Sequence, residues 1–144
     1  MRHPVWIDSD CGFDDMAAIS LVHADIKWHI IGISLVAGIA PMEHVVEHAE
    51  RMKAFLGWSM PIYRGAAKPL IGPLVTPDYA LGIGGLGTVG RIMPPVPAPS
   101  VADGAASALA AAAMASDQPI AILALGPLTN IAIALLAHPG LAAR

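Results

Sequence analysis

Eight consecutive residues near the N-terminus combine side chains that are common in active sites. The segment 8–15 (DSDCGFDD) holds four of the eleven acidic residues of the chain. Crowded carboxylates repel one another, and a cation that prefers oxygen ligands relieves that repulsion. Asp10 and Asp15 are separated by a glycine turn, so both can reach one ion. The pattern predicts a hard-cation site, with Ca²⁺ favoured over Mg²⁺ or Mn²⁺ because it accepts many flexible oxygen ligands.

Two other interpretations of the same carboxylates are weaker. Acidic residues at the start of a helix complement its dipole and cap its first turn, which would account for Asp14 and Asp15 but not for Asp8 and Asp10. A phosphotransferase with an Asp-x-Asp motif after its first strand would use Asp8 and Asp10 and leave Asp14 and Asp15 unexplained. Metal or polar-substrate binding is therefore the favoured hypothesis.

The elements that must position this turn alternate between strand and helix. Apolar runs predict strands at 5–8, 28–36, 61–63 and 120–125. Helical spacing or propensity predicts helices ending near 24 and 57, and others at 101–116 and 128–137. This order predicts an α/β fold, a mostly parallel Rossmann-like sheet with helices on both faces. In such sheets ligands bind beyond the carboxyl ends of the strands.

The chain is expected to form a single domain over residues 1–144, with a loop rich in glycine and proline at 65–100. A long segment of this kind inside a compact domain is typical of a functional loop or lid. The segments that follow the predicted strands, namely the acidic turn, 37–38, 64–65 and 125–126, should converge on one rim of the sheet.

Composition narrows the function classes and the location. The net charge of −3 without a basic patch argues against nucleic-acid binding. The uncharged stretch 118–137 is long enough to cross a bilayer, but Gly126-Pro127 interrupts it, so no membrane association is expected. The single cysteine, Cys11, suggests a reducing compartment, and Asp8 and Asp10 interrupt any signal-peptide pattern. A cytoplasmic location is therefore the expectation.

A second metal motif lies in the helix that begins near residue 42. The segment 44–48 (HVVEH) matches the H-x-x-E-H pattern of inverted zinc peptidases. A zinc site needs a third ligand, typically a downstream glutamate, and no glutamate follows Glu50. His44 and His48 also lie on the charged side of the helix, so we expect a solvated helix face there.

The acidic segment resembles the DxDxGxDD fingerprint of the nucleoside hydrolases, the inosine-uridine-preferring N-ribohydrolase family. Further segments are similar to this family in order and spacing: 32–38 (GISLVAG), 61–70 (PIYRGAAKPL), 85–90 (GLGTVG) and 124–135 (ALGPLTNIAIAL). The resemblance covers essentially the whole chain. It implies Ca²⁺-dependent hydrolysis of the N-glycosidic bond of ribonucleosides, in purine or pyrimidine salvage.

The resemblance also implies roles for individual residues. Asp10 and Asp15 would bind Ca²⁺ together with the backbone carbonyl of Leu125. Asp10 would also act as the general base. Asp14 and Asn130 would bind the substrate, with Asp14 at the ribose hydroxyls, and Asp8 would contact the metal ligands without binding the ion. The alternative for Thr129-Asn130 is that these residues cap the last helix.

Some positions depart from the family pattern. Ile39 replaces an asparagine that contacts ribose, Cys11 replaces a proline, and a His-Gly segment is missing near Leu81. Family members are considerably longer, which implies that the chain corresponds to an N-terminal half, incomplete relative to the family. We therefore expect weak or no turnover by this chain alone. The alternative is a truncated, non-catalytic homologue that binds metal or ribose, or that self-associates through exposed sheet edge, and a homo-oligomer is expected.

Overall fold

Five parallel strands form the sheet of this protein. The computed structural model describes residues 2–87, 93–96 and 100–143. The strands are β1 (His3–Ser9), β2 (Trp28–Leu35), β3 (Ile62–Arg64), β4 (Ala102–Asp103) and β5 (Ala121–Ala124). Their order across the sheet is β4-β3-β2-β1-β5, and every pairing is parallel. The predicted α/β fold with a parallel sheet is confirmed.

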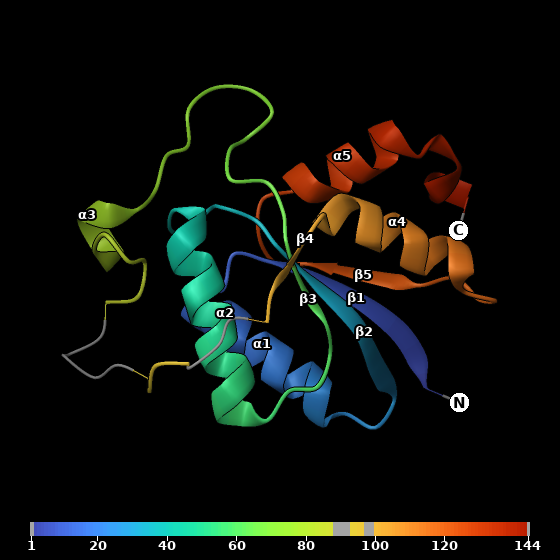
Figure 1. The fold of residues 1–144 in the computed structure, drawn as a ribbon, viewed down its shortest axis with the longest axis horizontal. Helices are drawn as coiled ribbons and strands as arrows, with labels where there is room; N and C mark the ends of the chain where they lie inside the picture. Colours follow the sequence, from blue (N-terminus) through green and yellow to red (C-terminus); the bar gives the residue numbers. More distant parts are fainter. Residues whose placement is uncertain (1, 88–92, 97–99, 144) are drawn as a thin grey trace.

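Helices cover both faces of this sheet (Figure 1). They are α1 (Phe13–Ala24), α2 (Met42–Leu56), α4 (Ala105–Ala115) and α5 (Thr129–Ala137), with the short helix α3 (Asp78–Leu81) and the 3₁₀ helix η1 (Pro139–Ala143). Helices α1 and α2 lie on one face, and α4 and α5 lie on the other (Figure 1). None of the helices within the described residues is long and apolar enough to cross a membrane.

Each face of the sheet buries its own core. Because side chains alternate along a strand, Ile7 of β1 packs into the core beneath α1 and α2, together with Ile19 and Val45. Its neighbour Trp6 packs into the core on the α4 and α5 side, with Leu109 among its neighbours. Both faces of β1 are therefore apolar at its centre, which explains the hydrophobic run at residues 5–7.

Three short elements, β4, α3 and η1, were not predicted. β4 comprises only Ala102 and Asp103, in a stretch where helical propensity predicted a helix from 101. Gly104, at φ 90°, separates this strand from α4, which begins at residue 105. Helix α3 lies inside the predicted loop 65–100. The final residues of the 85–90 motif lie outside the described residues.

The prediction of a solvated face on α2 is wrong for His48. Its side chain is 8% exposed, and Glu50 is 5% exposed. Glu50 is buried because the segment leading to β4 covers it. Glu50 accepts hydrogen bonds from the backbone N–H of Val101 at 2.7 Å and from the hydroxyl of Ser100 at 3.3 Å. Burial also lowers the pKa of His48.

Candidate functional site

The segments that follow four of the strands meet at one rim of the sheet, as predicted. The N–H of Val36, beyond β2, donates to the Ser9 carbonyl at 3.0 Å, and the N–H of Leu125, beyond β5, donates to the Asp8 carbonyl at 2.8 Å. The N–H of Ala37 donates to the carbonyl of Ala66, beyond β3, at 2.9 Å. These contacts follow from the order of the strands, which brings β5, β1, β2 and β3 side by side.

The acidic turn is organised around the carboxylate of Asp15. This side chain, in the first turn of α1, is 4% exposed. Its Oδ2 accepts hydrogen bonds from the Ser9 hydroxyl at 2.7 Å and from the N–H groups of Asp10 and Cys11 at 3.1 Å. Cys11 adopts a left-handed conformation with φ 55°, which is uncommon for a residue with a side chain. Asp15 therefore holds the turn in a tight, partly strained shape.

Asp10 is half-buried beside Asp15. Its Oδ2 accepts a hydrogen bond from the N–H of Ile39 at 2.7 Å. Burial, followed by the negative charge of Asp15, raises the pKa of Asp10 to about 7. A Cβ on Gly38 would overlap the Asp10 carboxylate, so only glycine fits at this position. The two carboxylates thus lie close together in a site where both cannot ionise without cost.

Asp8 lies beneath the turn and is completely buried. Its Oδ1 accepts hydrogen bonds from the hydroxyl of Ser34 and from Nδ2 of Asn130, the latter at 2.8 Å. Its Oδ2 is buried without a hydrogen-bond partner among the described residues. Burial raises the pKa of Asp8. The supporting role of Asp8 stays a prediction, and its burial leaves only protein groups around its carboxylate.

The other predicted residues differ in exposure. Asp14 is exposed at the start of α1, and its carboxylate lies over Gly12, where a Cβ would be 2.8 Å from Asp14 Oδ1. The side chain of Leu125 packs against the core, so this residue can offer the rim only its backbone. Asn130 is 1% exposed, and its amide contacts protein groups on two sides.

The donor set fits a calcium ion better than a transition metal. Within the described residues, no three His, Cys, Asp or Glu side chains come together at a site for a metal, which also leaves the H-x-x-E-H histidines without a third ligand. Asp10 and Asp15 bring two carboxylates, and the loop at Leu125 brings backbone carbonyls. Carboxylate and carbonyl oxygens completed by water suit Ca²⁺. A cation there would also relieve the repulsion that raises the pKa of Asp10.

Ser34 was not identified from the sequence as part of the site. Its hydroxyl accepts a hydrogen bond from Trp6 Nε1 at 2.9 Å and donates to Asp8. The signal that could have revealed it is a lone serine in an otherwise apolar strand, since a buried hydroxyl needs partners. The contribution of Ile39 was also missed, because its backbone N–H makes the contact and its side chain gives no sign of it.

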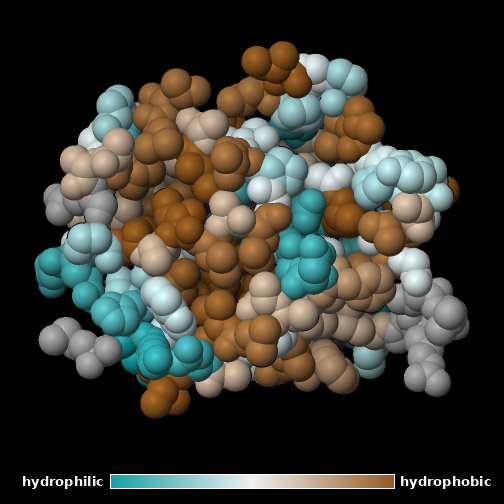
Figure 2. All heavy atoms as spheres, turned by 180° about the vertical axis from the view of Figure 1, so that it is seen from behind, coloured by the Kyte–Doolittle hydropathy of each residue, from teal (hydrophilic) through white to brown (hydrophobic). Residues whose placement is uncertain are grey.

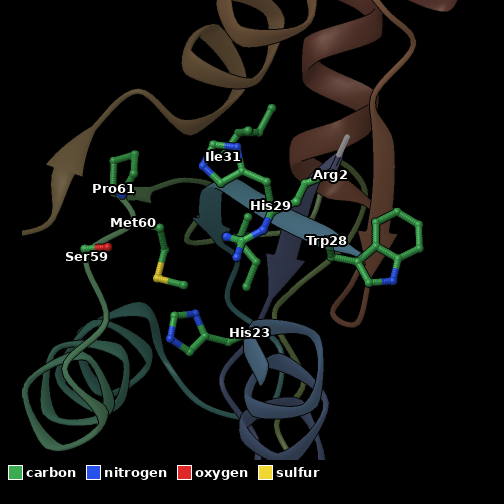
Figure 3. A pocket seen from close by; sticks show the side chains of 9 residues that line it. Arg2, His23, Trp28, His29, Ile31, Ser59, Met60 and Pro61 are labelled. Atoms are coloured by element: carbon green, nitrogen blue, oxygen red, sulfur yellow. The ribbon is translucent and has the colours of Figure 1, made fainter. Parts of the chain in front are cut away.

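Two hollows open at opposite ends of the sheet. The one on the rim has a volume of about 340 Å³ and is lined by Arg64, Asp103 and Asn130 among others. The other, of about 430 Å³, lies where the strands begin, and its lining includes Arg2, His23, Trp28 and His29 (Figure 3). The acidic turn and the basic hollow are thus separated by the length of the strands.

Comparisons with known proteins agree with this geometry. The sequence model of the inosine-uridine preferring nucleoside hydrolases matches residues 5–144. The pyrimidine-specific ribonucleoside hydrolase RihA of Shewanella woodyi is 34% identical over a 145-residue alignment, covering 98% of this chain and 45% of the relative. The non-specific ribonucleoside hydrolase RihC of Klebsiella pneumoniae is 33% identical over 139 residues, covering 96% of this chain and 45% of the relative.

Solved structures lead to the same family. An inosine-guanosine nucleoside hydrolase superposes with a TM-score of 0.86 at 30% identity, covering 97% of this chain and 44% of that protein. A purine-preferring ribonucleoside hydrolase from Gardnerella vaginalis gives a TM-score of 0.85 at 26% identity, covering 96% of this chain and 45% of that protein. The chain spans less than half the length of these relatives. It belongs to the inosine-uridine preferring nucleoside hydrolase family.

Proposed function

We propose that this protein takes part in Ca²⁺-dependent hydrolysis of the N-glycosidic bond of ribonucleosides. The observation that carries the proposal is the pair of neighbouring carboxylates, Asp10 and Asp15, held at the strand ends by backbone contacts. When bound, Ca²⁺ would lower the pKa of a coordinated water and orient it. Asp10, Asp15 and the backbone of Leu125 are the groups that would hold the ion.

The side chains of the turn suit the remaining steps. Without the ion, burial and the charge of Asp15 raise the pKa of Asp10 to about 7. Bound Ca²⁺ would lower this pKa, so Asp10 would be ionised near neutral pH and able to accept a proton from a nucleophile. Asp14, exposed at the helix start, can accept hydrogen bonds from the ribose hydroxyls. Cleavage of the glycosidic bond develops positive charge on the sugar ring, and the carboxylates beside it stabilise that charge. Asp8, fully buried, supports the turn and does not reach the substrate.

A second proposal, self-association, has its own structural support. β5 pairs with β1 on one side only within the described part of the chain, and Ile122 on this strand is 39% exposed. Leu128 and Leu136 in the following loop and helix are 61% and 75% exposed. Figure 2 shows hydrophobic side chains gathered across the middle of one face of the molecule. An exposed edge beside apolar surface favours association with another copy, so we propose a homo-oligomer.

The proposal is tested with the purified chain, Ca²⁺, and inosine or uridine. We expect calcium binding that Asp10→Ala abolishes, and base release that is slow but requires calcium. Asp117→Ala is the control, because Asp117 is an exposed carboxylate that precedes β5 at the opposite end of the sheet. Equal calcium affinity in the unmodified chain and in Asp10→Ala would contradict the assignment of Asp10 as a calcium ligand. Base release that persists in the presence of a chelator would contradict the calcium requirement.

Location in the cell stays a prediction from the sequence. Cys11 is free and 2% exposed, and burial raises the pKa of its thiol to about 12. The thiol is therefore protonated and shielded, which suits the reducing, cytoplasmic compartment that we propose.

A further inference from the structure

We propose that Asn130 is a positioning residue, which together with Asp8 holds the loop 125–128 against the acidic turn. We call this pair the Asp8–Asn130 clamp. The inference rests on the proposed function, because the loop carries the Leu125 carbonyl that would serve as a calcium ligand. It assigns Asn130 to the support of the site, whereas the sequence predicted a residue that contacts substrate.

The amide of Asn130 is fully used by protein groups. Nδ2 donates to Asp8 Oδ1 at 2.8 Å and to the Leu35 carbonyl at 2.9 Å, and Oδ1 accepts from the N–H of Ala66 at 2.8 Å. A primary amide has two N–H donors, and both are occupied here. Because Nδ2 faces two acceptors and Oδ1 faces an N–H donor, the amide can adopt only one of its two flipped orientations. A side chain that is 1% exposed and bonded in this way has no donor left for a ribose hydroxyl.

Asp8 holds both ends of the loop. Its backbone carbonyl accepts hydrogen bonds from the N–H of Leu125 at 2.8 Å and of Gly126 at 3.2 Å, where the loop begins. Its carboxylate accepts from Asn130, where the loop has passed into α5. The loop also packs directly on the turn, since a Cβ on Gly126 would be 2.9 Å from the backbone nitrogen of Asp10. The position of Leu125 relative to Asp10 thus depends on the clamp.

The surroundings leave the clamp little freedom. Asp8 is completely buried, so its carboxyl group depends on the donors Ser34 and Asn130. A Cβ on Gly65 would overlap the Asn130 amide, which shows that the amide fills its space. If Asn130 lost its two donors, Asp8 and the Leu35 carbonyl would each lose a buried hydrogen bond. The loop 125–128 would then be free to shift.

The test replaces the donating nitrogen without changing the size of the side chain. In Asn130→Asp, we expect calcium affinity to fall about 10- to 100-fold. This range is typical of mutations in residues that do not bind the metal but orient its ligands through hydrogen bonds. Amide hydrogen exchange at Leu125, Gly126 and Ala66 should become faster. Glu50→Gln is the matched control, since it also alters a buried polar side chain, and its hydrogen-bond partners Ser100 and Val101 are not those of the clamp. The control should leave both readouts unchanged.

Calcium affinity and amide hydrogen exchange test the proposed function and the clamp independently. If the unmodified chain binds no calcium, the calcium assignment fails, and the exchange rates alone decide whether the clamp exists. A folded Asn130→Asp protein with unchanged calcium affinity and unchanged exchange overturns the clamp. Weaker nucleoside binding with both readouts unchanged also overturns it, because that result places Asn130 on the substrate.

A second variant covers the case in which Asn130→Asp does not fold. Asn130→Ser is smaller, adds no charge beside Asp8 and leaves room for water, and the same changes in affinity and exchange are expected. If neither variant folds, the amide of Ala66 in the unmodified chain decides, because its acceptor is the Asn130 side chain. Slow exchange of Ala66, comparable with that of β1, supports the clamp, and exchange as fast as in an exposed loop overturns it.

Discussion

The two ends of the sheet differ in how their polar groups are held. At the rim, the carboxylates of Asp8, Asp10 and Asp15 each accept hydrogen bonds from defined donors. At the opposite end, the polar side chains of Arg2, His23 and His29 form no hydrogen bond or ion pair with another described residue, although they line the larger hollow (Figure 3).

This difference shows that volume alone does not identify a site. The polar side chains of the larger hollow make no hydrogen bond with another described residue, whereas the rim holds several groups of like charge close together against their mutual repulsion. A protein retains such an unfavourable arrangement when it serves a function, and strongly perturbed carboxylates therefore mark candidate sites. The comparison predicts large effects from changes at the rim and small ones from changes at the other end.

The largest effect on stability is expected from Asp15→Ala. This change leaves the Ser9 hydroxyl and the N–H groups of Asp10 and Cys11 without their acceptor, so the free energy of unfolding should fall by about 2 kcal/mol or more. The matched change at the other end, His29→Ala, removes an exposed side chain and should alter stability by less than about 0.5 kcal/mol. Urea unfolding measures both. Equal losses of stability in Asp15→Ala and His29→Ala would contradict the proposed difference between the two ends of the sheet.

Gly38→Ala should have the next largest effect. The added Cβ would overlap the Asp10 carboxylate and approach Pro127 Cδ to 2.8 Å, so overpacking should cost about 1–3 kcal/mol. Gly140→Ala is the control, because a Cβ there meets no atom within 4 Å. Denaturation midpoints compare the two variants. A Gly38→Ala protein as stable as the control would show that the rim is more pliable than its contacts indicate.

A charge on the β5 edge should weaken self-association. Ile122→Lys places a charge on a strand that is 39% exposed at this residue and pairs only with β1 among the described strands. We expect the unmodified chain to elute at a larger apparent size as its concentration rises, and the variant to elute as a monomer. Lys68→Ala, an exposed charge in another loop, is the control. Identical elution of all three proteins would exclude this edge as the interface.

The stability of the protein should also depend on pH. The folded-state pKa of Asp10, about 7, lies above the ordinary value of 3.8. The contribution of this group to the free energy of unfolding is therefore complete below about pH 4 and is lost as the pH rises through about 7. Urea midpoints across this range should fall less in Asp10→Asn than in the unmodified chain. Added Ca²⁺ should reverse the trend, and identical pH profiles for the two proteins would contradict the assignment.

Much of the fold could be predicted from the sequence. The strands β1, β2 and β5 read as apolar runs, although β5 at the edge of the sheet is only half-buried, and the acidic turn begins at the end of β1. The exceptions have physical causes. β4 is two residues long and too short to leave a pattern. The burial of Glu50 depends on the distant residues Ser100 and Val101, and the burial of His48 also depends on tertiary packing, which helical periodicity does not reveal.

The sequence by itself determined the family, the parallel α/β class and the place of the acidic turn at a strand end, because these follow from local patterns of residue types. Only the tertiary structure decided how deeply each carboxylate is buried and which donors it meets. Asp8 and Asn130 are 122 positions apart, and they meet because β5 pairs with β1. Strand order places Asp8 beneath the turn, Asp10 and Asp15 face to face, and Asp14 in solvent. Those differences in burial and partners, set by packing, separate four acidic residues that look alike in sequence.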